Sequence, residues 1–308
     1  MPKLVIFFEN ISSRILSIFL KPLFLILESS KIGRMALFKS KRPNTIFVSE
    51  ASNIKFLINS SDMGVGFPTY INKRAYDSEK VVLIFDFLQR QELGVKRSIL
   101  LDIGANIGTI GLTALAHGVV SEVWAFEPEP HNYSILVSNI SLNGLTESVR
   151  HFNVALTDSG DDSDLEFELD CVNFGDHRVR RTNKIGLYRE ESRQVIKVKS
   201  AMLDSFCDEL DFDNAIVWLD TQGYEGYVLS GSAMLIKNKV PIVTEFWPYG
   251  LKRSGCFDKF VDSILSGPYN SIVDLKNFKA TLNCDRSTLI ALSNIYGFDG
   301  VGTDLLIY

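Results

Sequence analysis

The chain has 308 residues, of which 46% are hydrophobic, 11% aromatic and 22% charged. This composition is typical of a globular protein with a sizeable core, and it excludes a disordered, collagen-like or disulfide-scaffold chain. The four cysteines and four histidines are scattered without close pairs. Zinc ribbons, redox dithiols and histidine pairs on one helix face are therefore not expected. Unpaired thiols indicate a reducing compartment, so we predict a cytoplasmic protein.

The net charge of −5 is unevenly distributed along the chain. Residues 1–42 carry eight basic and two acidic side chains, which leaves the remaining residues with a net charge of −11. Binding to nucleic acid needs a basic surface that displaces counterions from phosphate. The acidic body therefore predicts no nucleic-acid partner.

Residues 1–43 form a basic leader and linker in which apolar residues recur at helical spacing. The apolar stripe consists of Leu4, Phe7, Phe8, Ile11, Ile15, Ile18 and Phe19. Charged side chains interrupt it, so it is not expected to span a bilayer. Either it lies peripherally on the inner face of a membrane, with the basic residues of 1–42 facing anionic headgroups, or it packs on the body or on a second subunit. The sequence leaves both interpretations open.

Residues 44–97 are predicted to form an extension made of short strands and one helix. Residues 46–48 and 54–58 have the pattern of strands, and Gly64, Gly66 and Pro68 are typical of a loop. Residues 78–91 have an apolar helix face that Ser78 can cap.

From residue 98 onward, strand and helix patterns alternate, which predicts an α/β fold with a parallel sheet covered on both faces. The expected strands are residues 98–103, 120–126, 149–156, 215–219 and 241–246. The expected helices are residues 109–117, 130–143, 203–210, 224–237 and 257–265. Residues 157–200 interrupt this rhythm with two strand-like segments around a polar, basic stretch, and we interpret them as an inserted flap.

A glycine-containing loop, Asp102-Ile103-Gly104-Ala105-Asn106-Ile107-Gly108, follows the first of these strands. Gly104 and Gly108 allow the backbone to approach a ligand closely, and ligands of parallel sheets bind at the carboxyl ends of strands. Glu127 follows the next strand, 23 residues after Gly104. A carboxylate at that place accepts hydrogen bonds from both hydroxyls of a ribose. The alternative interpretation is a glycine turn with an unrelated surface glutamate.

The residues of this loop favour S-adenosylmethionine over NAD as the nucleoside ligand. A pyrophosphate cofactor prefers the pattern GxGxxG, whereas Asn106 stands at the middle glycine position. Asp102 would repel a phosphate but suits the ammonium group of S-adenosylmethionine.

These motifs resemble the FkbM family of methyltransferases over residues 98–247. The resemblance extends to Asn153-Val154-Ala155-Leu156-Thr157-Asp158, Asp220-Thr221-Gln222-Gly223-Tyr224-Glu225 and Glu245-Phe246-Trp247-Pro248-Tyr249-Gly250. It implies a Rossmann-like class I methyltransferase fold for residues 98–308, with a mostly parallel seven-stranded sheet and helices on both faces. It also implies O-methylation, often of sugars or secondary metabolites. The cofactor positions that follow are Asp102, Gly104, Asn106, Gly108, Glu127, Asn153 and Ala155.

Three residues are candidates for removing the proton of an acceptor hydroxyl. Asp220 ends a predicted strand and is the first candidate base or hydroxyl-orienting residue, although it could also cap the following turn. His177 in the flap is the second candidate, and Glu245 at the end of the next strand is the third. Glu225 is expected to complement the dipole of the helix that it enters.

The flap contains eight lysine or arginine residues and two acids between residues 177 and 199. This charge is compatible with an anionic acceptor, such as a phosphate-bearing or nucleotide-linked sugar, and equally with a solvated loop. No metal is expected to be required, because Asp220 and Glu245 alone are too few carboxylates for a metal site.

The sequence therefore predicts an S-adenosylmethionine-dependent O-methyltransferase acting on a small-molecule or glycan-precursor hydroxyl. A non-catalytic Rossmann-like binding or scaffold protein and an NAD-dependent oxidoreductase are the alternatives. An RNA methyltransferase is disfavoured by the acidic body.

Overall fold

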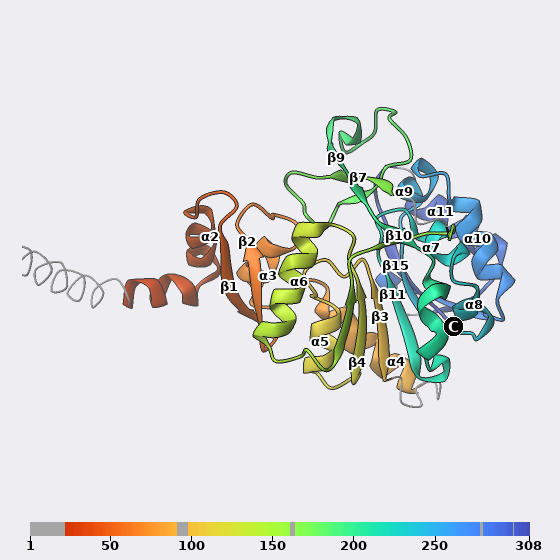
Figure 1. The fold of residues 1–308 in the computed structure, drawn as a ribbon, viewed down its shortest axis with the longest axis horizontal. Helices are drawn as coiled ribbons and strands as arrows, with labels where there is room; N and C mark the ends of the chain where they lie inside the picture. The colour runs from red at the N-terminus through yellow and green to blue at the C-terminus, as the bar shows by residue number, and fades with distance from the viewer. Residues whose placement is uncertain (1–21, 91–97, 161–163, 278–279, 298) are drawn as a thin grey trace, which may run out of the picture.

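The computed structural model describes residues 22–90, 98–160, 164–277, 280–297 and 299–308. Its centre is an eight-stranded sheet with the strand order β14-β13-β15-β12-β11-β3-β4-β5 (Figure 1). The strands are β3 (Ile99–Ile103), β4 (Glu122–Phe126), β5 (Val149–Phe152), β11 (Ala215–Leu219), β12 (Ile242–Phe246), β13 (Ser271–Asp274), β14 (Thr281–Asn283) and β15 (Thr303–Ile307).

Strands β5, β4, β3, β11 and β12 are parallel to one another, and β15 is antiparallel to both β12 and β13. The prediction of a mostly parallel sheet is confirmed, but the prediction of seven strands is wrong by one. The additional strand, β14, is a three-residue antiparallel partner of β13 at the edge of the sheet.

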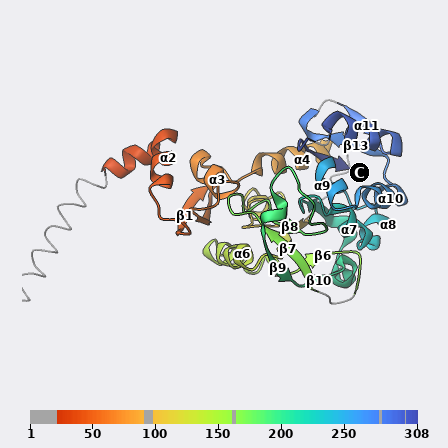
Figure 2. The ribbon, with the colours of Figure 1, turned by 90° about the horizontal axis from the view of Figure 1, so that it is seen from above.

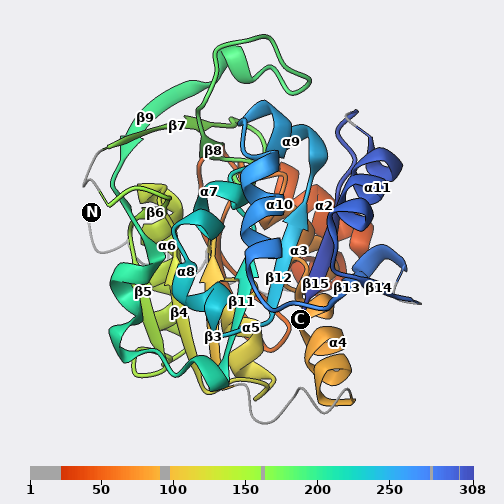
Figure 3. The same cartoon turned by 90° about the vertical axis from the view of Figure 1, so that its right-hand side faces the viewer.

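Helices lie on both faces of the central sheet (Figure 3). Side chains that alternate along the central strands fill two separate cores, one on each face of the sheet. In β3, Leu101 belongs to one core and Leu100 to the other; in β11, Val217 and Trp218 are divided in the same way. This period of two, in strands whose residues are all buried, is expected of a sheet with helices on both faces.

Different helices cover the two faces. Helices α7 (Glu225–Ser230), α8 (Ala233–Lys237), α10 (Phe257–Ser266) and α11 (Arg286–Tyr296) contribute to one core. Helices α3 (Gly66–Asn72), α4 (Ser78–Arg90), α5 (Gly111–Ala116) and α6 (Pro130–Leu142) contribute to the other. A short helix, α9 (Pro248–Arg253), follows β12.

Several predicted elements are shorter or divided in the structure. The helix predicted at 224–237 is two helices, α7 and α8, because the chain passes close to another segment at Gly231. A Cβ atom on Gly231 would lie 2.0 Å from the carbonyl oxygen of Thr157. The strand predicted at 149–156 divides into β5 and β6 (Ala155–Leu156), and β6 pairs with β10 (Ser200–Ala201) instead of the central sheet. The helix predicted at 203–210 is a 3-10 helix, Leu203–Glu209.

The flap contains a small antiparallel sheet in the order β8-β7-β9. Its strands are β7 (Leu165–Leu169), β8 (Arg178–Val179) and β9 (Gln194–Val198), and the 3-10 helix η1 (Glu190–Ser192) lies between β8 and β9. Figures 1 and 3 show this sheet above one end of the central sheet.

The N-terminal extension packs on the face that carries α5 and α6. It contains the antiparallel hairpin β1 (Ile46–Ala51) and β2 (Ile54–Asn59). The side chain of Asn139 in α6 accepts a hydrogen bond from the backbone N–H of Leu57 at 2.6 Å. Of the residues predicted to form a loop, Gly64 lies in a turn, whereas Gly66 and Pro68 lie in α3. The Asp62 carboxylate accepts hydrogen bonds from the backbone N–H groups of residues 64, 65 and 66 and so holds the start of this helix.

The predicted leader lies partly outside the described residues, which begin at residue 22. Helix α2 (Lys31–Lys39) lies beside α3 (Figure 2). It packs there through Phe38, whose ring centroid lies 5.1 Å from that of Phe67. Residues 23–26 are helical and exposed, with Leu25 and Ile26 each 66% accessible. Among the described residues, no helix is long and apolar enough to cross a bilayer. The apolar stripe from Leu4 to Phe19 lies outside the described residues.

Candidate functional site

A cavity of about 670 Å³ lies at the carboxyl ends of the central parallel strands. Its walls come from the loops after β3, β4, β11 and β12, from the flap, and from α4 and β15. The volume falls within the range of small-molecule sites, and the position is the usual one for ligands of open α/β sheets.

The loop after β3 brings the backbone to the edge of the cavity. Gly104 has φ +88°, and a Cβ atom there would lie 1.8 Å from the carbonyl oxygen of Asp220, so only glycine fits this position. Asn106 also has a positive φ of 51°, a conformation that asparagine tolerates better than most residues. Its side chain donates a hydrogen bond to the carbonyl of Phe174 in the flap at 2.9 Å.

Glu127 follows β4 and is 5% exposed. Its Oε2 accepts the backbone N–H of Asn106 and its Oε1 accepts that of Glu129, both at 2.8 Å. Burial raises the pKa of this carboxyl to about 8, against the lowering effect of the two backbone hydrogen bonds. Each oxygen keeps a second lone pair, so Glu127 can still accept hydrogen bonds from a diol in the cavity.

Asp102 in β3 is 1% exposed and also lines the cavity. Its Oδ2 accepts the backbone N–H of Gly111 at 2.9 Å, which holds the start of α5. Burial raises its pKa to about 7. A nearby positive charge would favour the ionised form of such a carboxyl.

The other predicted cofactor residues divide into lining and supporting positions. Ala155 lines the cavity together with Val154 and Leu156. Asn153 supports the turn after β4, because its side chain donates hydrogen bonds to the carbonyls of Glu127 and Pro128 at 2.8 and 3.1 Å. Gly108 faces the core beside Leu112 and Leu136.

All three predicted catalytic residues, Asp220, His177 and Glu245, line the same cavity. The Nδ1 atom of His177 accepts the backbone N–H of Asp170 at 3.0 Å. Burial lowers the pKa of His177 to about 4, so its ring is neutral and weakly basic near pH 7. This makes His177 a weaker candidate base than the carboxylates.

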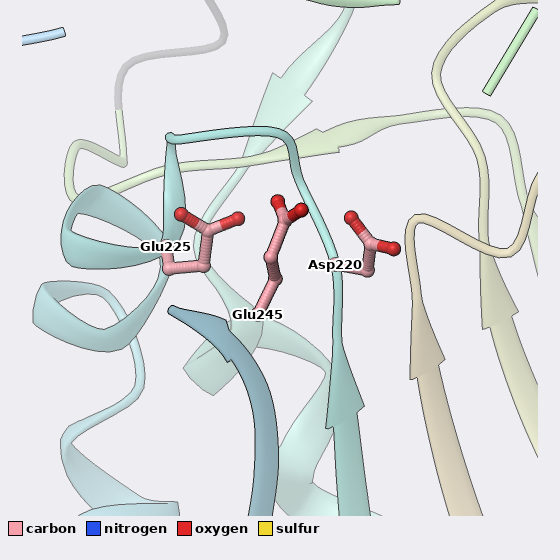
Figure 4. Close-up of side chains that lie close together, drawn as sticks. All are labelled: Asp220, Glu225 and Glu245. Atoms are coloured by element: carbon pink, nitrogen blue, oxygen red, sulfur yellow. The ribbon is translucent and has the colours of Figure 1, made fainter. Parts of the chain in front are cut away.

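Asp220 and Glu245 lie beside a third carboxylate, that of Glu225 (Figure 4). One oxygen from each of the three lies within 4.8 Å of the others. Burial raises the pKa of Asp220 to about 7 and also raises that of Glu245, and the neighbouring carboxylates act in the same direction. From the sequence, Glu225 was expected to complement the dipole of its helix, and its position beside the other two carboxylates was not predicted.

The flap arginines are engaged by buried acids that the sequence analysis did not pair with them. Arg178 is 5% exposed and forms ion pairs with Asp176 and with Glu190, the latter at 3.6 Å. Arg193 pairs with Asp176 and, at 2.9 Å, with Asp170. Arg178 and Arg193 therefore hold the flap together through these ion pairs.

The cavity has further lining residues beside the predicted cofactor and catalytic residues. Lys80 in α4 forms ion pairs with Asp77 at 2.8 Å and with Asp304 of β15 at 2.5 Å, and all three residues line the cavity. The rings of Tyr188 and Trp247 also line it, with their centroids 5.6 Å apart. These residues come from segments far apart in the sequence, and no local pattern joins them.

The strand order, with antiparallel β15 between β12 and β13, and the cavity at the carboxyl ends define a class I, Rossmann-like methyltransferase fold. Residues 102–263 match the family model described as the methyltransferase FkbM domain. This match covers more than half of the chain, so the chain belongs to that family. Family membership confirms the predictions of a methyltransferase and of S-adenosylmethionine as its cofactor.

Individual relatives are more distant. The 2-O-methyltransferase NoeI of Sinorhizobium fredii (strain NBRC 101917 / NGR234) is 24% identical over 160 residues, which cover 48% of this chain and 63% of that protein. The structure of methyltransferase FkbM from Methylobacillus flagellatus KT has a TM-score of 0.40 at 16% identity, covering 69% of this chain and 44% of that one. M. jannaschii TYW2 in complex with AdoMet has a TM-score of 0.39 at 13% identity, covering 87% and 86%.

Proposed function

We propose that the protein is an S-adenosylmethionine-dependent O-methyltransferase whose acceptor is a hydroxyl of an uncharged sugar, a glycan precursor or a related secondary metabolite. The observation that carries the proposal is that the predicted cofactor-binding residues and the carboxylates of two candidate bases line the same cavity. Glu127 and the loop at Gly104 lie in it with the carboxylates of Asp220 and Glu245.

The buried carboxyls of Asp102 and Glu127 fit this cofactor. Burial raises the pKa of each, and a positively charged group beside Asp102 would stabilise its ionised form. In the proposed complex, Glu127 accepts the ribose hydroxyls and Asp102 faces the ammonium group. Apolar lining at Val154, Ala155 and Leu156 accommodates the adenine ring.

When bound, S-adenosylmethionine supplies a methyl group on a positively charged sulfur, and the methyl–sulfur bond breaks with its electron pair on sulfur. The chain must hold the acceptor oxygen in line and remove its proton. Asp220 and Glu245 stand where strands β11 and β12 end, on the wall of the cavity. We assign Asp220 the role of accepting and orienting the acceptor hydroxyl, with Glu245 beside it.

The same end of the cavity suits a sugar ring better than an anion. Tyr188 and Trp247 offer aromatic faces to the apolar face of a ring, and Asp220, Glu245 and Asp304 are acceptors for its hydroxyl groups. The carboxylates would repel a phosphate. The 2-O-methyltransferase relative is consistent with transfer to oxygen.

An NAD-dependent oxidoreductase fits less well. A pyrophosphate needs free N–H groups at the start of the helix after the glycine loop. At the start of α5, the N–H of Gly111 is already bonded to the carboxylate of Asp102. A non-catalytic scaffold would retain the cofactor site but does not require the carboxylates at the acceptor end.

We place the protein in the cytoplasm, because its four cysteines are free and two of them, Cys207 and Cys256, are buried.

The test is incubation of the purified protein with methyl-labelled S-adenosylmethionine and a panel of acceptors. The panel pairs neutral sugars with the corresponding sugar phosphates, and mass spectrometry locates the transferred methyl group. Transfer to a hydroxyl of a neutral sugar is expected. Transfer only to nitrogen or carbon, or only to phosphorylated sugars, would contradict the proposal.

A further inference from the structure

The carboxylates of Asp220, Glu225 and Glu245 converge from three elements. Asp220 follows β11, Glu225 begins α7, and Glu245 lies in β12 (Figure 4). One oxygen of each lies within 4.8 Å of the other two. Asp220 and Glu245 also line the cavity, whereas Glu225 lies beneath its wall.

The burial and hydrogen bonding of the Glu225 carboxylate point to a ligand beside this cluster. Its side chain is fully buried, and its Oε1 accepts hydrogen bonds from the N–H groups of Thr221 and Gly223 at 2.9 and 3.1 Å. Its Oε2 is buried and has no hydrogen-bond partner among the residues that the structure describes, and the same is true of Oε2 of Glu245. A buried carboxylate oxygen without a partner is costly, so the structure favours a positive ligand between these groups.

We propose that Asp220, Glu225 and Glu245 bind a divalent cation of the Mg²⁺, Mn²⁺ or Ca²⁺ class at the acceptor end of the cavity. Such cations prefer carboxylate oxygens, at about 2.0–2.6 Å. Two oxygens on opposite sides of one ion are then about 4–5 Å apart, which agrees with the spacing of the cluster. No metal was expected from the sequence, because Asp220 and Glu245 alone are too few carboxylates for a site. In the structure, Glu225 is the third carboxylate.

The nearby basic side chains form ion pairs with other acids, and the charge of Arg178 also acts to lower the pKa of Glu245. Lys80 pairs with Asp77 and Asp304, and Arg178 pairs with Glu168, Asp176 and Glu190 in the flap. The alternative to a cation is that the three carboxyls share protons, which is compatible with their raised pKa values.

This inference rests on the proposed function and gives the acceptor end a specific chemistry. A cation held by Asp220 and Glu245 at the cavity wall would bind the acceptor oxygen, fix its position and ease the loss of its proton. The carboxylates would then act as ligands, and adjacent hydroxyls of a sugar would supply a second oxygen to the ion.

The test uses the full-length protein, freed of metal with EDTA and titrated with MnCl₂, MgCl₂ or CaCl₂ in a calorimeter. The variant Glu245→Gln removes one ligand charge with little change of shape. Glu122→Gln is the matched control, because it makes the same substitution at the start of β4, outside the cavity. We expect one cation per wild-type chain, an affinity reduced about tenfold or more in Glu245→Gln, and a change below about threefold in Glu122→Gln.

Saturable binding should also raise the thermal unfolding temperature of the wild type but not of Glu245→Gln. No saturable binding of any of the three ions at millimolar concentrations would overturn the proposal in favour of shared protons. Equal affinity in Glu245→Gln would overturn it as well. S-adenosylhomocysteine binding, measured with and without EDTA, separates this result from a failure of the proposed function, because Glu127 and the glycine loop do not depend on the cation.

Discussion

Replacing Glu127 with glutamine tests the proposed cofactor site most locally. The substitution keeps the size of the side chain but removes its charge and one of its two acceptor oxygens. In the structure, those oxygens accept N–H groups at 2.8 Å and retain lone pairs toward the cavity. A hydrogen bond to a charged group contributes about 1.5–3 kcal/mol. Because Glu127→Gln removes such a hydrogen bond, the variant should bind S-adenosylhomocysteine about 10- to 150-fold more weakly than the wild type.

The assay is calorimetric titration with S-adenosylhomocysteine, and Glu122→Gln is the matched control. Glu122 begins β4, the strand that Glu127 follows, and its Oε1 accepts the indole N–H of Trp124 at 2.6 Å. We expect the control to bind like the wild type. Unchanged affinity in Glu127→Gln, or equal losses in both variants, would refute the assignment of Glu127 to the ribose.

The pH dependence of the same titration provides a second check. Since burial raises the pKa of Glu127 to about 8, a large part of the free protein carries the protonated form near neutral pH. Ribose hydroxyls donate to the ionised form, so affinity should increase as the pH rises from about 6 to 9. This increase should be smaller in Glu127→Gln, and an identical profile in both proteins would contradict the argument.

Four further outcomes are expected. Asp220→Asn should lower turnover by about 10²- to 10⁴-fold while S-adenosylhomocysteine affinity stays within about threefold, and wild-type turnover would remove Asp220 from the acceptor site. Arg178→Met should reduce the free energy of unfolding by about 1.5–3 kcal/mol in denaturant titrations, because Asp176 and Glu190 lose one partner each but keep Arg193 and Arg253. The ligand-free protein should lose stability as the pH rises from about 4.5 to about 8, because the folded state retains the Glu127 proton that the unfolded chain releases, and a smaller slope is expected in Glu127→Gln. If the exposed side chains of Leu25 and Ile26 contact lipid, the double variant Leu25→Ser/Ile26→Ser should co-sediment less with anionic liposomes than the wild type, and equal co-sedimentation would exclude them.

Local patterns predicted the centre of the fold well. Strand β11 has the predicted bounds, Ala215–Leu219, because a fully buried run of five apolar residues has few alternatives in a parallel sheet. The positions of Gly104 and Glu127 at the cavity were predicted for the same kind of reason, since each directly follows a buried strand. No element was predicted after residue 265, where β13, β14, α11 and β15 are found.

The features that sequence reasoning missed depend on contacts between distant segments. Arg178 was counted as a free positive charge, but its partner Glu190 arrives through the fold of the flap. Glu225 was expected to complement the dipole of the helix that it enters, and in the structure one of its oxygens accepts the backbone N–H of Thr221. Its other role becomes visible only when β12 brings Glu245 beside it.

The most direct test of the central claim is calorimetric titration of the purified protein with S-adenosylhomocysteine, with NADH as the control ligand. The account predicts micromolar binding of S-adenosylhomocysteine, at about one molecule per chain, and no binding of NADH. Binding of NADH without S-adenosylhomocysteine would contradict the methyltransferase assignment, and binding of neither would favour the scaffold alternative.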